Sequence, residues 1–377
     1  MAGSMEADDA ASSPFEGPGS RFAIPRWAVA ILVLIAAIVI LWAIFVYYGG
    51  RRLEAGRPIL QAVIQGLVVG SIYVLGASGL SLTYGIKKFA NFSHGDMMTV
   101  GAYAAFTMNV IFAQNIFVGV AFAVLTLALL GVFLELAIFR QLEGRGPVSA
   151  LIASVGVSLV LQNVLSAIFT TNVQYLGVTP PSDIPLLNTG LSFNVVKGGV
   201  TLLVSSALIL FLHVLLKYTT LGKAMRACAD DLDLARTSGV NTRNVILWTW
   251  VISASLAAVA GVLLAIIVNV FPLLGFFVLL FIFAAVIIGG IGSPYGAMLG
   301  GLIIGIVQKL SNVVFGQLQG RFFEGGAEYE PVGAFLVMIA VLLLMPEGIM
   351  GSRRHAMGGR LAALRSRWRS PEVKQPG

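Results

Sequence analysis

The chain alternates long apolar runs with short polar segments along most of its length. A bilayer core of about 30 Å requires about 20 mostly apolar residues in one helix. Ten runs approach this length and predict membrane-spanning helices at residues 27–48, 59–86, 91–113, 115–139, 148–171, 197–217, 245–270, 276–292, 294–316 and 331–347. We therefore predict an all-α, polytopic membrane protein with about ten transmembrane helices and a short cytoplasmic helix.

The polar segments divide the chain into four parts. Residues 1–26 form a polar N-terminal leader, and 27–48 form an extra N-terminal transmembrane helix. That helix lacks the charged start and cleavage pattern of a secretory signal, so we expect it to be retained. Residues 59–352 form the helical core domain, and 353–377 form a basic cytoplasmic tail.

Basic residues occur in alternate loops, which predicts the orientation of the chain. Lysine and arginine are enriched in the cytoplasmic loops of membrane proteins. One side of the predicted topology carries Lys87, Lys88, Arg140, Arg145, Lys217, Lys223, Arg226, Arg236, Arg243 and the tail. We assign this side and both termini to the cytoplasm. Helix 27–48 fits less well, because Arg51, Arg52 and Arg57 would then lie outside.

The composition agrees with this pattern and excludes several classes of protein. Apolar residues make up 58% of the chain and charged residues 11%, and the net charge is +7. Soluble domains contain about 25% charged residues. The chain therefore lacks the polar surface of a soluble enzyme, a nucleic-acid binder or a disordered scaffold. One cysteine and three scattered histidines predict neither a disulfide framework nor a metal site.

Polar residues crowd between two apolar runs at Asn91, Ser93, His94 and Asp96. Polar side chains near membrane depth are costly and tend to mark a pathway or a buried partner. One interpretation places all four on a translocation pathway. The other has Asn91 or Ser93 capping the next helix and Asp96 complementing its dipole. The two interpretations are compatible.

Gly289, Gly290 and Gly292 open a glycine-rich stretch that continues to Gly305. Small residues four positions apart let helices approach closely in lipid, so tight packing is the favoured interpretation. The sequence Gly-Gly-Ile-Gly-Ser-Pro also interrupts the helix twice. Broken backbone at membrane depth is tolerated where it lines protein or a water-filled cavity, so a hinge that lines the pathway is the alternative.

The polar segment 220–244 is predicted to form a short surface helix. It alternates helix-favouring residues with charges, stops at Gly239 and restarts through Asn241 and Thr242. An ordinary basic loop would explain its lysines and arginines. It would not explain the ordered alanine, leucine and aspartate pattern that precedes Gly239.

The remaining motifs do not predict an enzyme. Gly222-Lys223 is followed by Ala224 and has no glycine five residues before it, so the chain lacks a P-loop. Glu135, His213 and Lys309 each lie within about two turns of a predicted helix end. For these three side chains, snorkelling to the interface is favoured over a proton relay.

Several blocks of the sequence, in this order and spacing, resemble the permeases of high-affinity branched-chain amino-acid ABC importers, the H-type inner-membrane subunit. The resemblance covers about residues 60–352. It rests on NFSHGD at 91–96, RACADDLDLARTSGVNTRNV at 226–245, SLAAVAGVLLA at 255–265, GGIGSPYGAMLGGLIIG at 289–305 and MPEGIMG at 345–351.

This resemblance implies a pore subunit in the bacterial plasma membrane. Its partners would be a related second permease, two cytoplasmic P-loop ATPases and a periplasmic or lipid-tethered solute-binding protein. It implies no cofactor on this chain, with ATP and Mg²⁺ bound by the ATPases. The Arg-rich tail would contact membrane lipid, and no nucleic acid is expected.

The resemblance also implies roles for single residues. An ATPase-coupling helix would involve Arg226, Asp230, Asp233, Ala235, Gly239 and Asn241. The segment Asn91 to Asp96 would lie near the cytoplasmic end of the pathway, although family members usually have Ala and Glu where Ser93 and Asp96 stand. Leucine, isoleucine and valine are the leading solutes. Urea, short amides or other amino acids are alternatives, and an ATP-independent channel or secondary transporter is less favoured.

Overall fold

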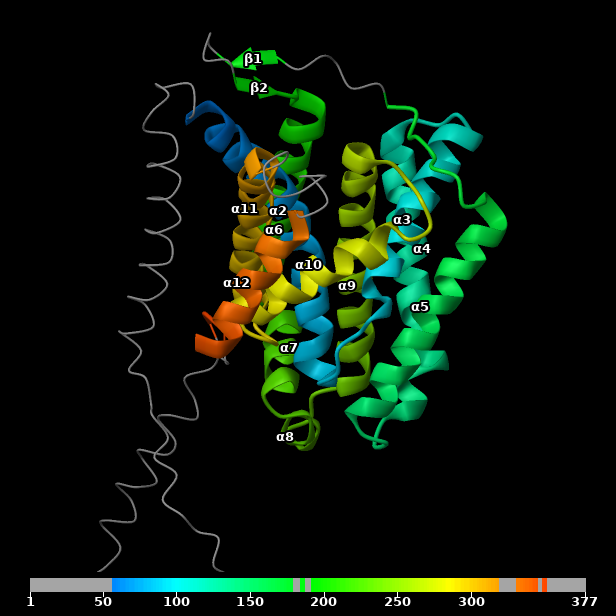
Figure 1. The fold of residues 1–377 in the computed structure, drawn as a ribbon. Coiled ribbons are helices and arrows are strands. Elements are labelled where there is room, and N and C mark those ends of the chain that lie inside the picture. The colour runs from blue at the N-terminus through cyan, green and yellow to red at the C-terminus, as the bar shows by residue number, and fades with distance from the viewer. Residues whose placement is uncertain (1–55, 179–183, 187–190, 319–329, 345–347, 351–377) are drawn as a thin grey trace, which may run out of the picture. The chain divides into compact units, whose positions relative to one another are not determined.

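The computed structural model describes residues 56–178, 184–186, 191–318, 330–344 and 348–350, most of them helical (Figure 1). Nine of the ten predicted apolar runs overlap these residues, and each of the nine contains a described helix. The leader 1–26, the predicted helix 27–48 and the tail 353–377 lie outside the described residues.

The main helices follow the predicted runs closely. They are α2 (Gly56–Lys87), α3 (Ser93–Phe106), α4 (Ile116–Ala137), α5 (Pro147–Phe169), α6 (Thr201–Tyr218), α9 (Thr242–Val268), α10 (Leu274–Gly289), α11 (Pro294–Leu318) and α12 (Glu330–Leu344). In the described part of the chain, six helices are long and apolar enough to cross a membrane, and α10 and α12 are shorter apolar helices. The prediction of an all-α, multi-pass membrane protein is confirmed.

Shorter elements connect these helices. They are the π-helical turns η1 (Thr107–Ile111) and η3 (Val195–Val200), the 3-10 turn η2 (Phe139–Leu142), the helices α7 (Thr220–Asp230) and α8 (Leu232–Thr237), and the strands β1 (Ile184–Leu186) and β2 (Leu191–Phe193). The two strands pair antiparallel with Ile184 opposite Phe193. This small hairpin was not predicted from the sequence.

Polar and conformationally special residues begin several helices. The side chain of Asn115 accepts a hydrogen bond from Phe117 N at the start of α4, and Thr219 Oγ1 accepts one from Gly222 N at the start of α7. These contacts satisfy backbone donors that have no partner inside the helix. Pro147 occupies the first turn of α5. Its missing N–H has no energetic cost there, because an N–H in the first turn has no acceptor within the helix.

Helix α9 forms the centre of the helical core and is buried along most of its length (Figure 1). It packs against α2, α3 and α4. A Cβ atom at Gly101 of α3 would lie 2.8 Å from Ala258 Cα of α9, so the two backbones are almost in contact. In lipid, apolar side chains gain little by leaving the solvent, so helices associate through van der Waals packing. Small residues allow that packing because they let the backbones approach closely.

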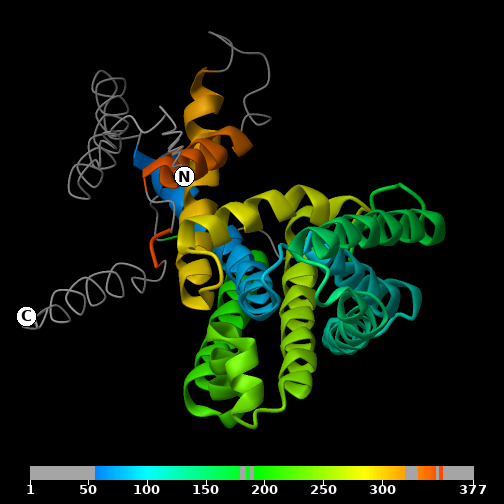
Figure 2. The ribbon, with the colours of Figure 1, turned by 90° about the horizontal axis from the view of Figure 1, so that it is seen from below.

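Helix α10 runs obliquely across its neighbours in both views (Figures 1 and 2). It packs against α2, α3, α11 and α12. A Cβ atom at Gly275 would lie 1.8 Å from Gly95 O of α3, and Thr99 Oγ1 accepts a hydrogen bond from Gly275 N at 2.8 Å. Glycine at position 275 therefore allows α10 to begin directly against α3.

The basic loops that were predicted to share one side meet at one end of the helices. Lys87 Nζ lies 2.7 Å from Glu143 Oε1 of the loop that follows η2. Lys88 Nζ donates a hydrogen bond to Ala229 O of α7 at 2.7 Å. This common location agrees with the predicted alternation of loops, and we refer to it as the basic end.

Candidate pathway and coupling sites

Asn91 organises the turn that leads into α3. Its buried Oδ1 atom accepts hydrogen bonds from Ser93 N at 3.1 Å and from Ser93 Oγ at 2.7 Å. The contact occupies the backbone donor of the first residue of the helix. The N-cap position of α3 is Phe92, which makes no side-chain capping bond, so Asn91 stabilises the turn before the helix rather than capping it. A pathway role for Asn91 and Ser93 stays a prediction.

His94 connects α3 to α2. Its ring is buried, and Nε2 lies 2.9 Å from Gly76 O. A carbonyl oxygen only accepts hydrogen bonds, so Nε2 is the donor in this contact. Gly79 provides space for the ring, because a Cβ atom at position 79 would lie 3.1 Å from His94 Cε1. The structure therefore gives His94 a helix-packing role, and its predicted pathway role stays a prediction.

Asp96 connects α3 to α5. Its carboxylate accepts hydrogen bonds from Ser158 Oγ and, at 3.0 Å, from Gln162 Nε2. All three side chains are buried. Ser158 and Gln162 were not singled out from the sequence, although two polar residues four positions apart in an apolar helix signal one polar stripe. Asp96 is therefore held by α5, and its predicted pathway role stays a prediction.

The glycines between α10 and α11 allow a tight reversal of the chain. A Cβ atom at Gly289 would lie 2.0 Å from Gly296 O, so the helix ends touch through their backbones. Gly290 and Gly292 have φ values of +110° and +82°, which favour glycine. The packing interpretation of this stretch is confirmed.

Residues 348–350 close the same corner. Ile349 N donates to Ile288 O at 2.8 Å, and Met350 N donates to Gly289 O at 2.9 Å. A Cβ atom at Gly348 would lie 2.5 Å from Gly290 N. Two of the blocks that carry the family resemblance, 289–305 and 345–351, therefore lie in contact.

A cavity of about 650 Å³ lies at the basic end. Gly85 of α2, Arg226 and Asp230 of α7, Gly292 of the reversal and Met350 all line it. The cavity thus brings together the predicted pathway residue Gly292 and the predicted coupling residues Arg226 and Asp230. We refer to it as the inner cavity.

The predicted surface helix is two helices, α7 and α8, separated at Asp231. The Asp231 carboxylate accepts hydrogen bonds from Asp233 N at 3.0 Å and Leu234 N at 2.9 Å, so it caps α8. Ala235 is buried, whereas Leu234 is 64% exposed. An exposed leucine at the tip of a polar segment is a candidate contact for another protein.

Gly239 and Asn241 join α8 to α9. Gly239 has a φ of +86°, and an added Cβ atom would have nothing within 4 Å, so backbone conformation rather than space requires glycine there. Asn241 Oδ1 accepts a hydrogen bond from Asn244 N at 3.2 Å and caps α9. The predicted stop and restart of the helix at these residues are confirmed, and their coupling roles stay predictions.

Cys228 lies on the buried side of α7. Burial raises the pKa of its thiol. The thiolate is the reactive form, and a raised pKa lowers its fraction at any given pH.

We expect Cys228 to react with a maleimide at pH 7.5 about tenfold more slowly than a cysteine at the exposed position 233. The comparison uses the native chain and the variant Cys228→Ser with Asp233→Cys, with labelling followed by mass shift. The rate for Cys228 should increase as the pH rises towards the thiol pKa. Equal rates for the two thiols would contradict the burial of this face of α7.

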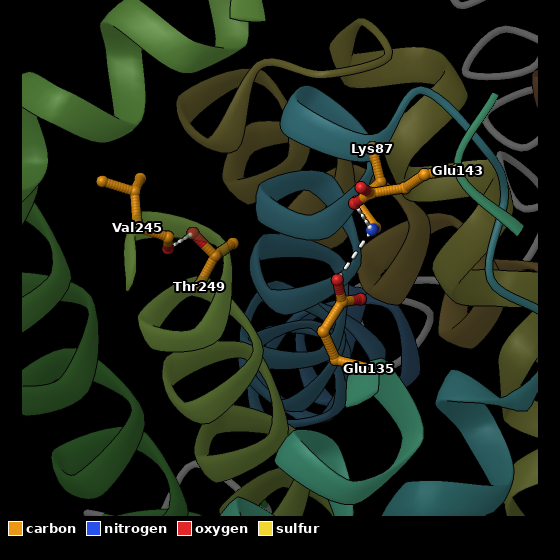
Figure 3. A network of polar contacts seen from close by, with 5 residues as sticks. All are labelled: Lys87, Glu135, Glu143, Val245 and Thr249. Atoms are coloured by element: carbon orange, nitrogen blue, oxygen red, sulfur yellow. Dashed lines mark hydrogen bonds and ion pairs between the residues drawn. The ribbon is translucent and has the colours of Figure 1, made fainter. Parts of the chain in front are cut away.

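A buried ion network joins α2 to α4 at the basic end (Figure 3). Lys87 Nζ lies 2.7 Å from Glu135 Oε1 and 2.7 Å from Glu143 Oε1. The side chain of Glu135 is 3% exposed, so the expectation that it snorkels to the interface was wrong. The apolar neighbours of Glu135 in the sequence gave no sign of a lysine 48 positions away. Figure 3 also shows a separate contact within α9, where Thr249 Oγ1 donates to Val245 O at 2.8 Å.

Comparison with known proteins gives a consistent result. The family described as branched-chain amino acid transport system / permease component matches residues 62–345. The high-affinity branched-chain amino acid transport system permease protein LivH of Escherichia coli K12 is 36% identical over 310 residues, which is 78% of this chain and 95% of LivH. The high-affinity branched-chain amino acid transport system permease protein BraD of Pseudomonas aeruginosa is 33% identical over 303 residues, which is 78% of this chain and 95% of BraD. A probable branched-chain amino acid transport permease, LivM of Methanocaldococcus jannaschii, is 27% identical over 293 residues, which is 74% of this chain and 80% of LivM.

Proposed function

The chain belongs to the branched-chain amino acid transport permease family, and from this membership we propose that it forms one half of the pore of an ATP-driven importer for leucine, isoleucine and valine. It is a multi-pass membrane permease. The names of its relatives favour branched-chain amino acids over urea or short amides. They also favour a subunit of a transport system over a stand-alone channel.

The proposed assembly contains several other chains. The likeness to LivM as well as LivH supports a related second permease as the other half of the pore. Because this chain has no P-loop, two cytoplasmic ATPases would bind and hydrolyse ATP with Mg²⁺. A solute-binding protein would deliver the amino acid from outside. The complex would lie in the bacterial plasma membrane, with the basic end and both termini of this chain in the cytoplasm.

The inner cavity is the observation that carries the proposed coupling. Arg226 and Asp230 of α7 and Gly292 between α10 and α11 line the same space. A displacement of α7 by the ATPases would therefore change the wall of this space directly. ATP shifts the balance between outward-open and inward-open states only by binding one of them more tightly. In our proposal that state is the one in which the ATPases are closed.

Purification of the complete complex tests this proposal. The tagged chain is extracted gently from native membranes, and its partners are identified by mass spectrometry. We expect a second permease and P-loop ATPases, and ATP-dependent uptake of leucine after reconstitution into vesicles. Leucine uptake that proceeds without ATP and without partner chains would instead establish a channel or secondary transporter.

Leu234→Asp should reduce leucine uptake at least tenfold while the amount of chain in the membrane stays unchanged. Leu234 is 64% exposed, so its side chain contributes little to the fold of this subunit. A buried apolar contact with an ATPase would be lost when a charge is introduced. Uptake into cells and the recovery of ATPase with the tagged chain measure the effect.

Leu234→Met is the matched control, because it keeps an apolar side chain at the same position. It should retain most of the uptake and the bound ATPase. Normal uptake by Leu234→Asp would show that the tip of α8 is not part of the contact.

A further inference from the structure

The inner cavity lies at the depth where the membrane-spanning helices end. Three candidate spans contribute residues near the same end, namely Ile59–Lys87, Lys197–Tyr218 and Pro294–Val313. The lining residues in question are Gly85 and Ile86, Leu216, and Pro294 and Tyr295. Helix α7 packs against α2 and α6 at this end (Figure 1). A ligand in the cavity would therefore lie where the hydrocarbon core of the bilayer meets the polar headgroups.

Two basic side chains of α7 line the inner cavity. Lys223 and Arg226 are three positions apart, so they lie on one face of that helix. Both are exposed, and within the described part of the chain neither side chain forms a hydrogen bond or an ion pair. Asp230 contributes one negative charge to the described lining, so its two positive charges leave a net charge of +1. This balance favours an anionic group in the cavity.

The start of α11 adds a further positive potential. Ser293, Pro294 and Tyr295 line the cavity, so the N-terminus of a 25-residue helix borders it. The N-terminus of a helix carries a partial positive charge and favours phosphate groups. Ser81 of α2 also lines the cavity, and its buried hydroxyl has no hydrogen-bond partner among the described residues. The inner cavity thus combines two cations, a helix N-terminus and an unpartnered polar group.

Part of the lining is apolar and exposed. Ile291 is 50% exposed and Met350 is 47% exposed, and we refer to these two residues as the apolar edge of the cavity. Tyr295 lies beside them in the lining, and its Oη lies 3.2 Å from His213 Nδ1 of α6. Tyrosine is enriched at membrane–water interfaces, where one end of its side chain is apolar and the other polar. The cavity therefore offers both a site for an anion and an apolar exit beside it.

We propose that the inner cavity binds an anionic phospholipid, with its phosphate near Lys223 and Arg226 and its acyl chains leaving over the apolar edge. Basic pockets between membrane helices on the cytoplasmic side bind lipid headgroups. A free phosphate ion would leave the apolar edge uncovered. A zwitterionic lipid would bring its own cation towards the two cations of α7. The binding goes beyond the proposed function and does not depend on it.

A lipid titration tests the binding. The purified full-length chain, with the partners that it retains, is mixed in detergent with phosphatidylglycerol or phosphatidylcholine, and native mass spectrometry measures the lipid bound. Lys223→Gln and Arg226→Gln should each lower the affinity for phosphatidylglycerol about fivefold, the loss expected for one basic residue near an anionic lipid. The double variant should lower the affinity by about 25-fold. Phosphatidylcholine should bind weakly, and equally to the native chain and the variants.

Two controls and one further variant accompany the titration. Lys223→Arg keeps the charge, and Lys217→Gln removes an exposed cation at the same end of the helices that does not line the cavity. Neither control should change the affinity measurably. Ile291→Asp tests the apolar edge, because its carboxylate would repel the phosphate and remove an apolar contact. It should lower the affinity for phosphatidylglycerol, and the fold should tolerate it because Ile291 is half exposed.

Competition distinguishes a lipid from other anions. Inorganic phosphate and leucine should not displace phosphatidylglycerol from the native chain. Displacement by inorganic phosphate would show a phosphate site, and displacement by leucine would show a part of the solute pathway. Either result would overturn the assignment to lipid. So would a double variant that loses the ATPases but binds phosphatidylglycerol normally, because α7 would then contact the ATPase instead.

Uptake measurements separate this inference from the proposed function. A bound lipid would connect α7 to the start of α11, so the native complex should import leucine faster in vesicles that contain phosphatidylglycerol than in phosphatidylcholine alone. The double variant should not respond to phosphatidylglycerol. If the native complex imports no leucine in either vesicle, the proposed function is wrong, and the titration still decides the lipid site. Equal affinity for phosphatidylglycerol in the native chain and in all variants of native Tm would overturn the lipid site.

Discussion

Replacement of Lys87 by methionine should destabilise the chain by about 3–5 kcal/mol, because it leaves the buried carboxylate of Glu135 without its cation. The two side chains are 7% and 3% exposed, and their charged atoms lie 2.7 Å apart. Removal of one partner of a buried pair costs much more than the pair contributes, since the remaining charge has lost its hydration. The Tm of the purified complex and the amount of chain in the membrane measure this loss.

Two further variants show whether the buried charge is the cause. Glu143 is 44% exposed, so Glu143→Gln should cost less than about 1 kcal/mol. Lys87→Met combined with Glu135→Met removes both charges and should recover most of the lost stability. A Lys87→Met chain as stable as the native chain would refute the ion pair as described.

Gly261→Val should prevent stable packing of α9 on α3. A Cβ atom at position 261 would lie 1.9 Å from Met98 O, which is a backbone atom and cannot rotate away. The two central helices would have to separate, and overpacking of a core typically costs about 1–3 kcal/mol, with larger costs where the neighbour cannot move. We expect the variant chain to be degraded or aggregated, as measured by fluorescence-detected size-exclusion chromatography of a tagged chain.

Gly156 provides the matched control because it lies within α5 and has nothing within 4 Å of an added Cβ atom. Gly156→Ala should be neutral or up to about 1 kcal/mol more stable, since alanine favours helix over glycine. If Gly261→Val elutes and melts like the native chain, α9 and α3 do not approach as closely as described.

The helices and their ends could be predicted largely from sequence. Helix α9 begins at Thr242 and ends at Val268, and the predicted run was 245–270. Apolar length and polar interruptions are local signals, and the bilayer fixes the length that a spanning helix needs. The turn residue Asn91 and the capping residue Asn241 are local signals too, because the side chain of each accepts a hydrogen bond from a residue within three positions of itself.

Contacts between distant segments could not be predicted in this way. Asp96 meets Ser158 and Gln162, which lie 62 and 66 positions further along the chain. The Lys87 to Glu135 pair and the inner cavity likewise depend on how helices pack, and helical periodicity alone does not fix that. The break at Asp231 was missed for a different reason. Two adjacent aspartates offer two possible caps, and only the backbone shows which one begins α8.

The contact of residues 348–350 with the reversal between α10 and α11 has a consequence for biosynthesis. Ile349 and Met350 donate backbone hydrogen bonds to Ile288 and Gly289, and Met350 forms part of the wall of the inner cavity. During translation, α10 and α11 leave the ribosome before these residues exist. The corner at Gly289 is therefore completed only near the end of synthesis, and a nascent chain truncated before residue 348 would lack part of the wall between the coupling segment and the membrane helices.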